Sequence, residues 1–260
     1  MAMNCLLRWM AMACLLLVCT MAAPNSQAGV VLNGTRFVYP SQEKEISIKL
    51  VNQGKGPVLV KTWLDNGDVI ALPETIKVPF TLNPPIFRME ADKEMALRLT
   101  YTGDASLAKD RESLFWLNVM EVPSRPNEKK AEISNTIQLA FRYRLKLFFR
   151  PDGLPGSPKD AASELMWSLV PSEGNHGALA LRVTNDRPYF VSLTEVKLVR
   201  DGQALVVEPD TIAPLSSREF KLDGASIKEK AEDDRRCWAV DYRWIDEWGG
   251  LVTNKKPLLR

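Results

Sequence analysis

The sequence has few of the residues from which catalytic and metal sites are built. It holds one histidine, His176, and four cysteines, three of which lie within the first 19 residues. One histidine cannot build a histidine-based metal site. The motifs GxSxG, HExxH and CxxC and a glycine-rich phosphate loop are also absent. We therefore expect no enzyme activity, no metal and no cofactor, while a carboxylate pair of the glycosidase kind stays open on spacing alone.

An excess of charge of one sign is also missing. The chain has 34 lysine and arginine residues against 32 aspartate and glutamate residues, a formal net charge of +2. Such a balance produces no long-range field that would steer the protein to nucleic acid or to a membrane surface. We expect neither a nucleic-acid partner nor stable membrane association.

The first 28 residues differ in composition from the rest of the chain. Arg8 is followed by an uncharged run over residues 9–23, and the SQA of residues 26–28 fits the small-x-small pattern before a cleavage site. About 15 apolar residues fall short of the ~20 that a membrane span needs. The sequence therefore predicts a signal peptide that is cleaved after Ala28. The exported chain keeps one cysteine and forms no intramolecular disulfide.

Short alternating segments separated by turn residues fill the remainder of the chain. They form two series, and between them the RPDGLPGSPKDA of residues 150–161 holds three prolines and two glycines. Such spacing predicts antiparallel sandwiches or barrels, and the proline-rich stretch predicts a hinge. We expect an all-β chain with one domain over residues 29–150 and a second over residues 151–260.

The stretch NTIQLAFRYRLKLFFRP, residues 135–151, has the period of a β-strand over an unusual length. Strands are most often about 5–6 residues long. From residue 137 to residue 149 the odd positions are all apolar or aromatic, namely Ile137, Leu139, Phe141, Tyr143, Leu145, Leu147 and Phe149. At a sheet edge, such a strand would be a template for another chain. Either the fold covers it, or a partner does.

Several stretches together resemble the periplasmic pilus chaperones of chaperone/usher secretion. They are VLNGTRFVYP at residues 31–40, DRESLFW at 110–116, KLFFRP at 146–151 and WIDEWGG at 244–250. The resemblance covers essentially the whole chain after the leader. It implies two immunoglobulin-like β-sandwich domains in a boomerang arrangement, of which the N-terminal one binds pilin subunits in the periplasm. It also implies an outer-membrane usher that receives the subunit.

The same resemblance assigns the apolar row of the long strand to the client. Family members lend alternating apolar residues to the pilin by donor-strand complementation. Ile137, Leu139 and Phe141 match these positions, with Tyr143 as a possible fourth. An ordinary core face is the alternative, and it is the commoner explanation for an alternating strand.

The resemblance further implies an anchor for the C-terminal carboxylate of the pilin. Its two cations fall on Arg36 and Lys146, and solvated surface cations are the alternative for each. Lys146 is even while the apolar row is odd, so a flat strand would point them to opposite faces. We expect a bulge or a strong twist between Phe141 and Lys146 to re-aim one of them.

An inter-domain charge network is the last implied feature. It falls on Glu112, Arg150 and Glu247, and Asp246 could take the place of Glu247. The segment before the donor strand, residues 123–133, is short and free of cysteine, which resembles the short-loop branch of the family.

Two other functions remain as alternatives. One is a surface or adhesive structural protein made of two immunoglobulin-like domains, and the other is a periplasmic carbohydrate-active enzyme. The sequence leaves open which pilin and usher are served, and whether the free protein caps itself as a dimer.

Overall fold

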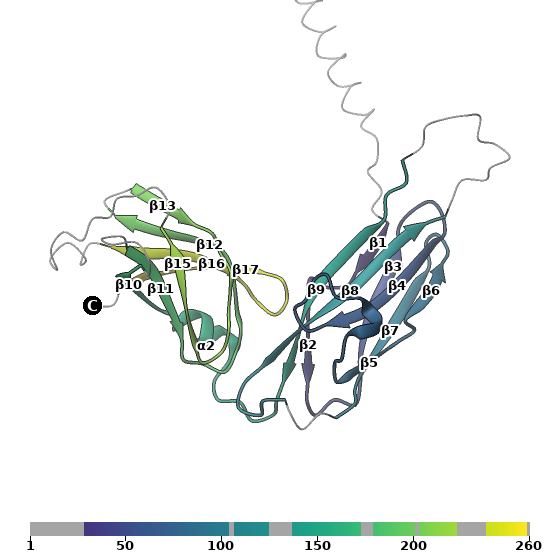
Figure 1. The fold of residues 1–260 in the computed structure, drawn as a ribbon, viewed down its shortest axis with the longest axis horizontal. Coiled ribbons are helices and arrows are strands. Elements are labelled where there is room, and N and C mark those ends of the chain that lie inside the picture. Colours follow the sequence, from purple (N-terminus) through teal and green to yellow (C-terminus); the bar gives the residue numbers. More distant parts are fainter. Residues whose placement is uncertain are drawn as a thin grey trace, which may run out of the picture.

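The computed structural model describes residues 29–103, 107–124, 137–172, 179–200, 203–222 and 238–258. Two β-sandwiches, joined end to end, make up this part of the chain and are set at an angle to each other (Figure 1). The prediction of an all-β chain with two immunoglobulin-like domains is confirmed. The predicted signal peptide, His176 and Cys237 lie outside the described residues.

The N-terminal sandwich consists of two sheets that enclose one apolar core. In each strand, alternate residues point inward, as Phe115, Leu117 and Val119 do in β8. The first sheet has the order β1-β3-β7-β5, with β1 Val30–Leu32, β3 Ile46–Asn52, β7 Glu94–Tyr101 and β5 Phe80–Asn83. The second has the order β2-β9-β8-β4-β6, with β2 Arg36–Pro40, β9 Phe141–Arg150, β8 Ser113–Pro123, β4 Val58–Asp65 and β6 Ile86–Met89.

The beginning of the chain contributes to both of these sheets. Strand β1 pairs antiparallel with β3, and the chain then crosses over so that β2 pairs parallel with β9. The crossing falls at residues 33–35, which belong to neither strand. As a result, β2 accompanies β9 only from Lys146 to Arg150.

The C-terminal sandwich repeats the two-layer plan around Trp167 and Tyr242, whose rings lie 5.3 Å apart. One sheet has the order β10-β11-β15, with β10 Met166–Pro171, β11 Leu179–Asn185 and β15 Ser216–Lys221. The other has the order β13-β12-β16-β17, and β14 also pairs with β12; the bounds are β13 Gln203–Val207, β12 Val191–Arg200, β16 Ala239–Ile245, β17 Leu251–Pro257 and β14 Thr211–Ile212.

The segment between the sandwiches is not the plain hinge that its prolines predict, because it ends in a short helix, α2 (Pro158–Ser163). Ser157 caps this helix, and its Oγ accepts a hydrogen bond from the backbone N–H of Asp160 at 3.2 Å. Pro158 occupies the first turn, where its missing N–H costs nothing. Within the described ranges, which also contain the 3₁₀ turn η1 (Pro73–Thr75), no helix is long and apolar enough to cross a membrane.

The long strand expected over residues 135–151 is shorter in the structure. β9 begins at Phe141, the residue opposite Glu121 in the last pair of the β8–β9 ladder. Residues 137–140 have no strand assignment, since no neighbouring backbone among the described residues pairs with them. Ile137 and Leu139, the first two residues of the alternating apolar row, therefore lie outside the β-sheet.

Candidate functional site

The faces of β9 point in two directions, and the even-numbered face is directed at the C-terminal sandwich. The ring of Phe148 packs against that of Phe190 of that domain in a tilted arrangement, with 5.6 Å between the ring centres. Two residues earlier, Lys146 stands directly opposite Arg36 of β2 in the parallel ladder. The turn between β16 and β17 reaches toward the same strands (Figure 1). Arg36 and Lys146 therefore lie side by side between the domains, at a cleft that Arg36 lines together with Arg150 and Glu247.

Lys146 is held in the cleft by hydroxyl groups. Its Nζ donates to Ser192 Oγ at 3.0 Å and also to Thr211 Oγ1, both on the C-terminal domain. Burial, together with the positive charge of Arg36, lowers the pKa of Lys146 to about 8, against the opposing effect of Asp210. The ammonium thus carries its charge at some cost, which an added anion would relieve.

Arg36 has unused hydrogen-bonding capacity. Its Nη1 donates to the carbonyl of Ile245 at 2.9 Å, while its buried Nε has no hydrogen-bond partner among the described residues. Burial lowers the pKa of Arg36, and the charge of Asp246 partly offsets this. In the part of the chain that the structure describes, no carboxylate lies within 4.0 Å of the charged nitrogens of Arg36 or Lys146. Two adjacent cations therefore lack an acidic partner.

The odd-numbered face of β9 changes character along the strand. Leu147 and Phe149 are buried in the N-terminal core, and Tyr143 packs against its margin. Farther toward the N-terminus, the apolar side chains stand in solvent: Phe141 is 51% exposed, Leu139 59% and Ile137 85%. One row of side chains thus serves the core of its own domain at one end and has no described core around it at the other.

The backbone of β9 changes in the same way. Residues 146–149 pair with β2 on one side and with β8 on the other, whereas residues 141–145 pair with β8 alone. Along residues 141–145, the far edge has no described strand beside it. This edge is a place where an extended chain could add a strand.

The bulge that was expected between Phe141 and Lys146 is not present. The β8–β9 register runs without a shift from Glu121–Phe141 to Ser113–Phe149. The apolar row and Lys146 accordingly lie on opposite faces of a regular strand.

The three residues of the expected inter-domain network lie in direct contact. Arg150 Nη2 is 2.7 Å from Glu112 Oε1 and 2.6 Å from Glu247 Oε1. Glu112 Oε2 also accepts the N–H of Phe190 at 2.8 Å. Burial raises the pKa of Glu112 against the opposing effect of Arg150, and the two carboxylates raise the pKa of Arg150 despite its own burial. These contacts connect β9, the start of β8 and the β16–β17 turn.

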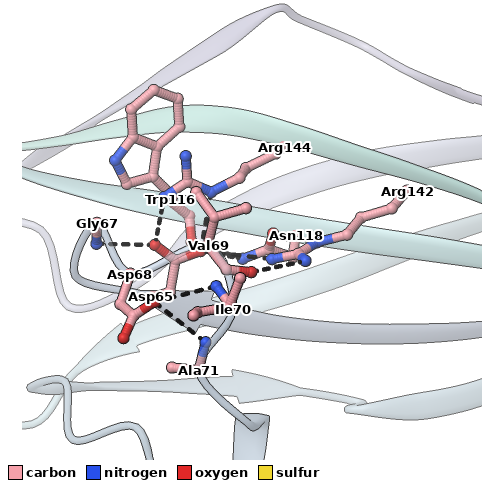
Figure 2. Close-up of polar contacts among 10 residues, drawn as sticks. All are labelled: Asp65, Gly67, Asp68, Val69, Ile70, Ala71, Trp116, Asn118, Arg142 and Arg144. Carbon is pink, nitrogen blue, oxygen red and sulfur yellow. Dashed lines mark hydrogen bonds and ion pairs between the residues drawn. The ribbon is translucent and has the colours of Figure 1, made fainter.

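Sequence reasoning missed a polar cluster on the outer face of the same sheet (Figure 2). Asp65 is fully buried, and Arg144 binds it with two hydrogen bonds, of 2.6 and 3.0 Å. Asn118 donates to Asp65 at 2.8 Å, and Arg142 donates to Asn118 at 3.0 Å. Arg142 also holds the neighbouring loop, because its Nη1 donates a hydrogen bond to the carbonyl of Val69. From the sequence, the two arginines are only basic neighbours of the apolar row. Their pairing with Asp65 and Asn118 depends on tertiary contacts between different strands.

The hydroxyl partners of Lys146 also lacked a signal in the sequence, because β12 and β14 reach it from the other domain. Among the described residues, no group of three histidine, cysteine, aspartate or glutamate side chains could hold a metal ion.

What the described residues provide is an open strand edge, an exposed apolar row and two cations that form no ion pair. Those are the features of a protein that binds an extended polypeptide by strand addition.

Comparison with known proteins agrees with this class. Residues 29–155 match the family model "Pili and flagellar-assembly chaperone, PapD N-terminal domain", and residues 160–256 match "Pili assembly chaperone PapD, C-terminal domain". The chain is 40% identical to the probable fimbrial chaperone YadV of Escherichia coli strain K12 over 240 residues, which covers 92% of this chain and 94% of that protein. It is 38% identical to the chaperone protein FimB/FhaD of Bordetella pertussis, with 88% of both chains covered.

A solved structure shows the same similarity in three dimensions. The crystal structure of the YadV chaperone matches with a TM-score of 0.72 and 37% identity, over 89% of this chain and all of that one. The chain therefore belongs to the pili assembly chaperone family. The resemblance drawn from its motifs is confirmed, and with it the role of a chaperone in pilus assembly.

Proposed function

We propose that this chaperone binds pilin subunits in the periplasm by donor-strand complementation and passes them to an outer-membrane usher. Residues 1–28 act as the signal peptide, with cleavage after Ala28. Residues 29–150 form the domain that holds the subunit, and residues 151–260 form the second domain. The protein works by binding, without catalysis or a cofactor.

The exposed apolar row is the observation that carries this proposal. Ile137, Leu139 and Phe141 are more than half exposed and lie beyond the margin of their own core. Burying one fully exposed side chain of this kind contributes about 1.5–3 kcal/mol; since the three are already partly buried, they would together contribute about 3–6 kcal/mol before the cost of ordering the segment. Tyr143 lies at the core margin and would contact the client at the end of the row.

The open edge supports the same conclusion through the backbone. Residues 141–145 can hydrogen-bond a strand of the client on the side away from β8. A pilin that lacks a strand would gain that strand from β9. In the free protein, a second copy of the chain could occupy the edge, which makes a self-capped dimer the competing state.

Arg36 and Lys146 serve as the anchor for the C-terminal carboxylate of the subunit. A carboxylate between them would receive charge-assisted hydrogen bonds, each worth about 1.5–3 kcal/mol. Its negative charge would also raise the lowered pKa of Lys146. Glu112, Arg150 and Glu247 hold the domains so that Ser192 and Thr211 keep Lys146 in place.

The test is recovery of a pilin from the periplasm with tagged chaperone. We expect Arg36→Met and Lys146→Met to remain folded and to lose the subunit. Lys255→Met is the matched control, because Lys255 is an exposed lysine of β17, on the other domain. Normal recovery with both cleft variants would rule out the anchor.

A peptide experiment isolates the carboxylate itself. An alternating apolar peptide that copies the last strand of a pilin is made with a free C-terminus and, in parallel, with a C-terminal amide. We expect tighter binding of the free acid to the wild-type chaperone, and a smaller difference between the two peptides with Lys146→Met, which keeps Arg36. Equal binding to the wild type would mean that the cations serve another purpose.

A further inference from the structure

A buried carboxylate occupies a position of the N-terminal core that its neighbours fill with apolar groups. The inward row of β8 runs through Phe115, Leu117 and Val119, and the next inward residue is Glu121, which is only 5% exposed. A carboxylate in such surroundings is costly unless a donor or a cation compensates it. Neither the strand pattern nor the pilin-binding site requires an acid here.

The hydrogen-bond partner of Glu121 is the first residue of β1. Its Oε2 accepts the backbone N–H of Val30 at 2.5 Å, which links β8 of one sheet to β1 of the other. No lysine or arginine side chain of the described residues lies within ion-pair distance of Glu121. The carboxylate therefore has a neutral donor but no described counter-charge.

Gly29 lies directly against this carboxylate. A Cβ atom added to Gly29 would come within 2.6 Å of Glu121 Oε2 and 2.7 Å of its Cδ, so a side chain there would have to displace the carboxylate. The α-nitrogen and a Cβ on the same carbon are about 2.5 Å apart, which places the nitrogen of Gly29 within about 5 Å of Oε2. The Gly29 carbonyl is also fixed, since it accepts the N–H of Gln53 at 2.9 Å.

We propose that Glu121 is a binding site for a primary ammonium group, namely the α-ammonium of Gly29 that signal-peptide cleavage creates. This inference rests on the proposed cleavage after Ala28. In the precursor, the nitrogen of Gly29 belongs to an uncharged amide. A signal peptidase hydrolyses that amide with one water molecule, so that Ala28 leaves as a carboxylate and the Gly29 amine takes up a proton.

Cleavage thus supplies a counter-charge that the described residues of the domain do not provide. A free α-amino group has a pKa of about 7.7–8.0, and a neighbouring carboxylate keeps it protonated at neutral pH. The ammonium would pair with Glu121 at the point where the two sheets meet. Glu121 stands opposite Phe141, the first residue of β9, so the pair closes the sandwich beside the open edge.

Two forms of the wild-type sequence test the site without any substitution. One chain begins at Gly29 and the other at Ala28, each released from a fusion by a protease that leaves no extra residue. In the second chain, the nitrogen of Gly29 is again part of an amide, and the ammonium group lies one residue farther away, on Ala28. We expect the Gly29 form to melt higher by at least ~3 °C, and equal melting temperatures would overturn the proposal.

A substitution then connects the effect to the carboxylate. In the Glu121→Gln background, the difference between the two starting residues should disappear, because the amide has no charge to pair with the ammonium. A difference of unchanged size in that background would also overturn the proposal.

The reactivity of the amine provides a readout that does not depend on melting. We expect an acylating reagent at pH 7 to modify the Gly29 amine of the wild-type chain at least ~10-fold more slowly than that of Glu121→Gln, and equal rates would contradict the pairing. Mass analysis of the periplasmic protein separately locates the natural cleavage site. A different natural N-terminus would refute cleavage after Ala28, and the ammonium pair of the mature protein with it, whereas the melting comparison judges the site by itself.

Discussion

The two ends of β9 lie in different surroundings although they share one strand and one alternating pattern. From Lys146 to Phe149, the backbone is paired on both sides, and Leu147 and Phe149 are buried in the core of their own domain. From Phe141 to Leu145, the backbone is paired only with β8, and the side chains grow steadily more exposed toward Ile137. One end belongs to the fold, and the other is available to a partner.

The difference shows how a stable protein can keep a reactive strand edge. The buried end holds the strand in place through core packing and through Arg150, so the exposed end needs no core of its own. On the even face, Arg142 and Arg144 are tied to the Asp65 cluster and keep the exposed end regular.

The largest effect is expected from Arg150→Met at the buried end. It leaves Glu112 buried without a cation, and removing one member of a buried pair costs about 3–5 kcal/mol. Denaturant unfolding of the full chain measures the change. Arg182→Met is the matched control, because its partner Glu219 is exposed and such a pair contributes at most about 1 kcal/mol. If Arg150→Met lost no more than this control, the network would not hold the domains.

Leu147→Ala tests the core at the same end. Leu147 is fully buried, so we expect a loss of about 2–5 kcal/mol in the free energy of unfolding. Client binding by the protein that remains folded should be nearly normal, because this side chain is buried in the core of its own domain and does not reach the client. Thermal melting and subunit pulldown, done on the same preparation, separate the two properties. A variant that stays stable but no longer binds the client would mean that Leu147 serves client binding and not the core.

Lys146→Met is expected to have a smaller effect that depends on pH. Between pH 8 and 10.5, the unfolded chain holds a proton at Lys146 that the folded chain has lost, so the stability of the wild type rises with pH over this window. Because Lys146 keeps part of its hydration, we expect a gain of only about 1–2 kcal/mol relative to Lys146→Met between pH 7 and pH 10. Unfolding midpoints at both pH values check this, and parallel profiles would contradict it.

The smallest change in stability is expected from Leu139→Ser at the exposed end. Its side chain is 59% exposed, and changes at such positions usually stay within about 0.5 kcal/mol. Subunit binding should nevertheless fall strongly, since a polar group would enter the apolar groove of the client. A drop in melting temperature as large as that of Leu147→Ala would mean that the fold itself buries this residue, and the donor-strand proposal would have to be withdrawn.

The fold and the family could be predicted from the sequence because their signals are local. Alternation and turn residues indicate strands, and the motifs around Arg36, Glu112, Lys146 and Arg150 retain their order along the chain. The helix α2 also had a local signal, the Ser-Pro-x-Asp of residues 157–160, which the surrounding prolines obscured.

The rest could not be predicted, because it depends on contacts between distant segments. Glu121 and Gly29 are about ninety positions apart, and Asp65 and Arg144 come from different strands. The orientation of Lys146 was a further difficulty, since periodicity assigns a face but does not say that the second domain lies opposite it. Packing alone reveals these pairings.

The position at which the chain crosses from one sheet to the other, residues 33–35, also sets the length of strand that a client can pair with. Since β2 joins β9 only at Lys146, the place of the crossing decides how many residues of β9 keep a free edge. A chain that crossed two residues earlier would extend β2 along β9 to Arg144. The client would then have two fewer residues to pair with, at the end of the strand nearest the anchoring cations.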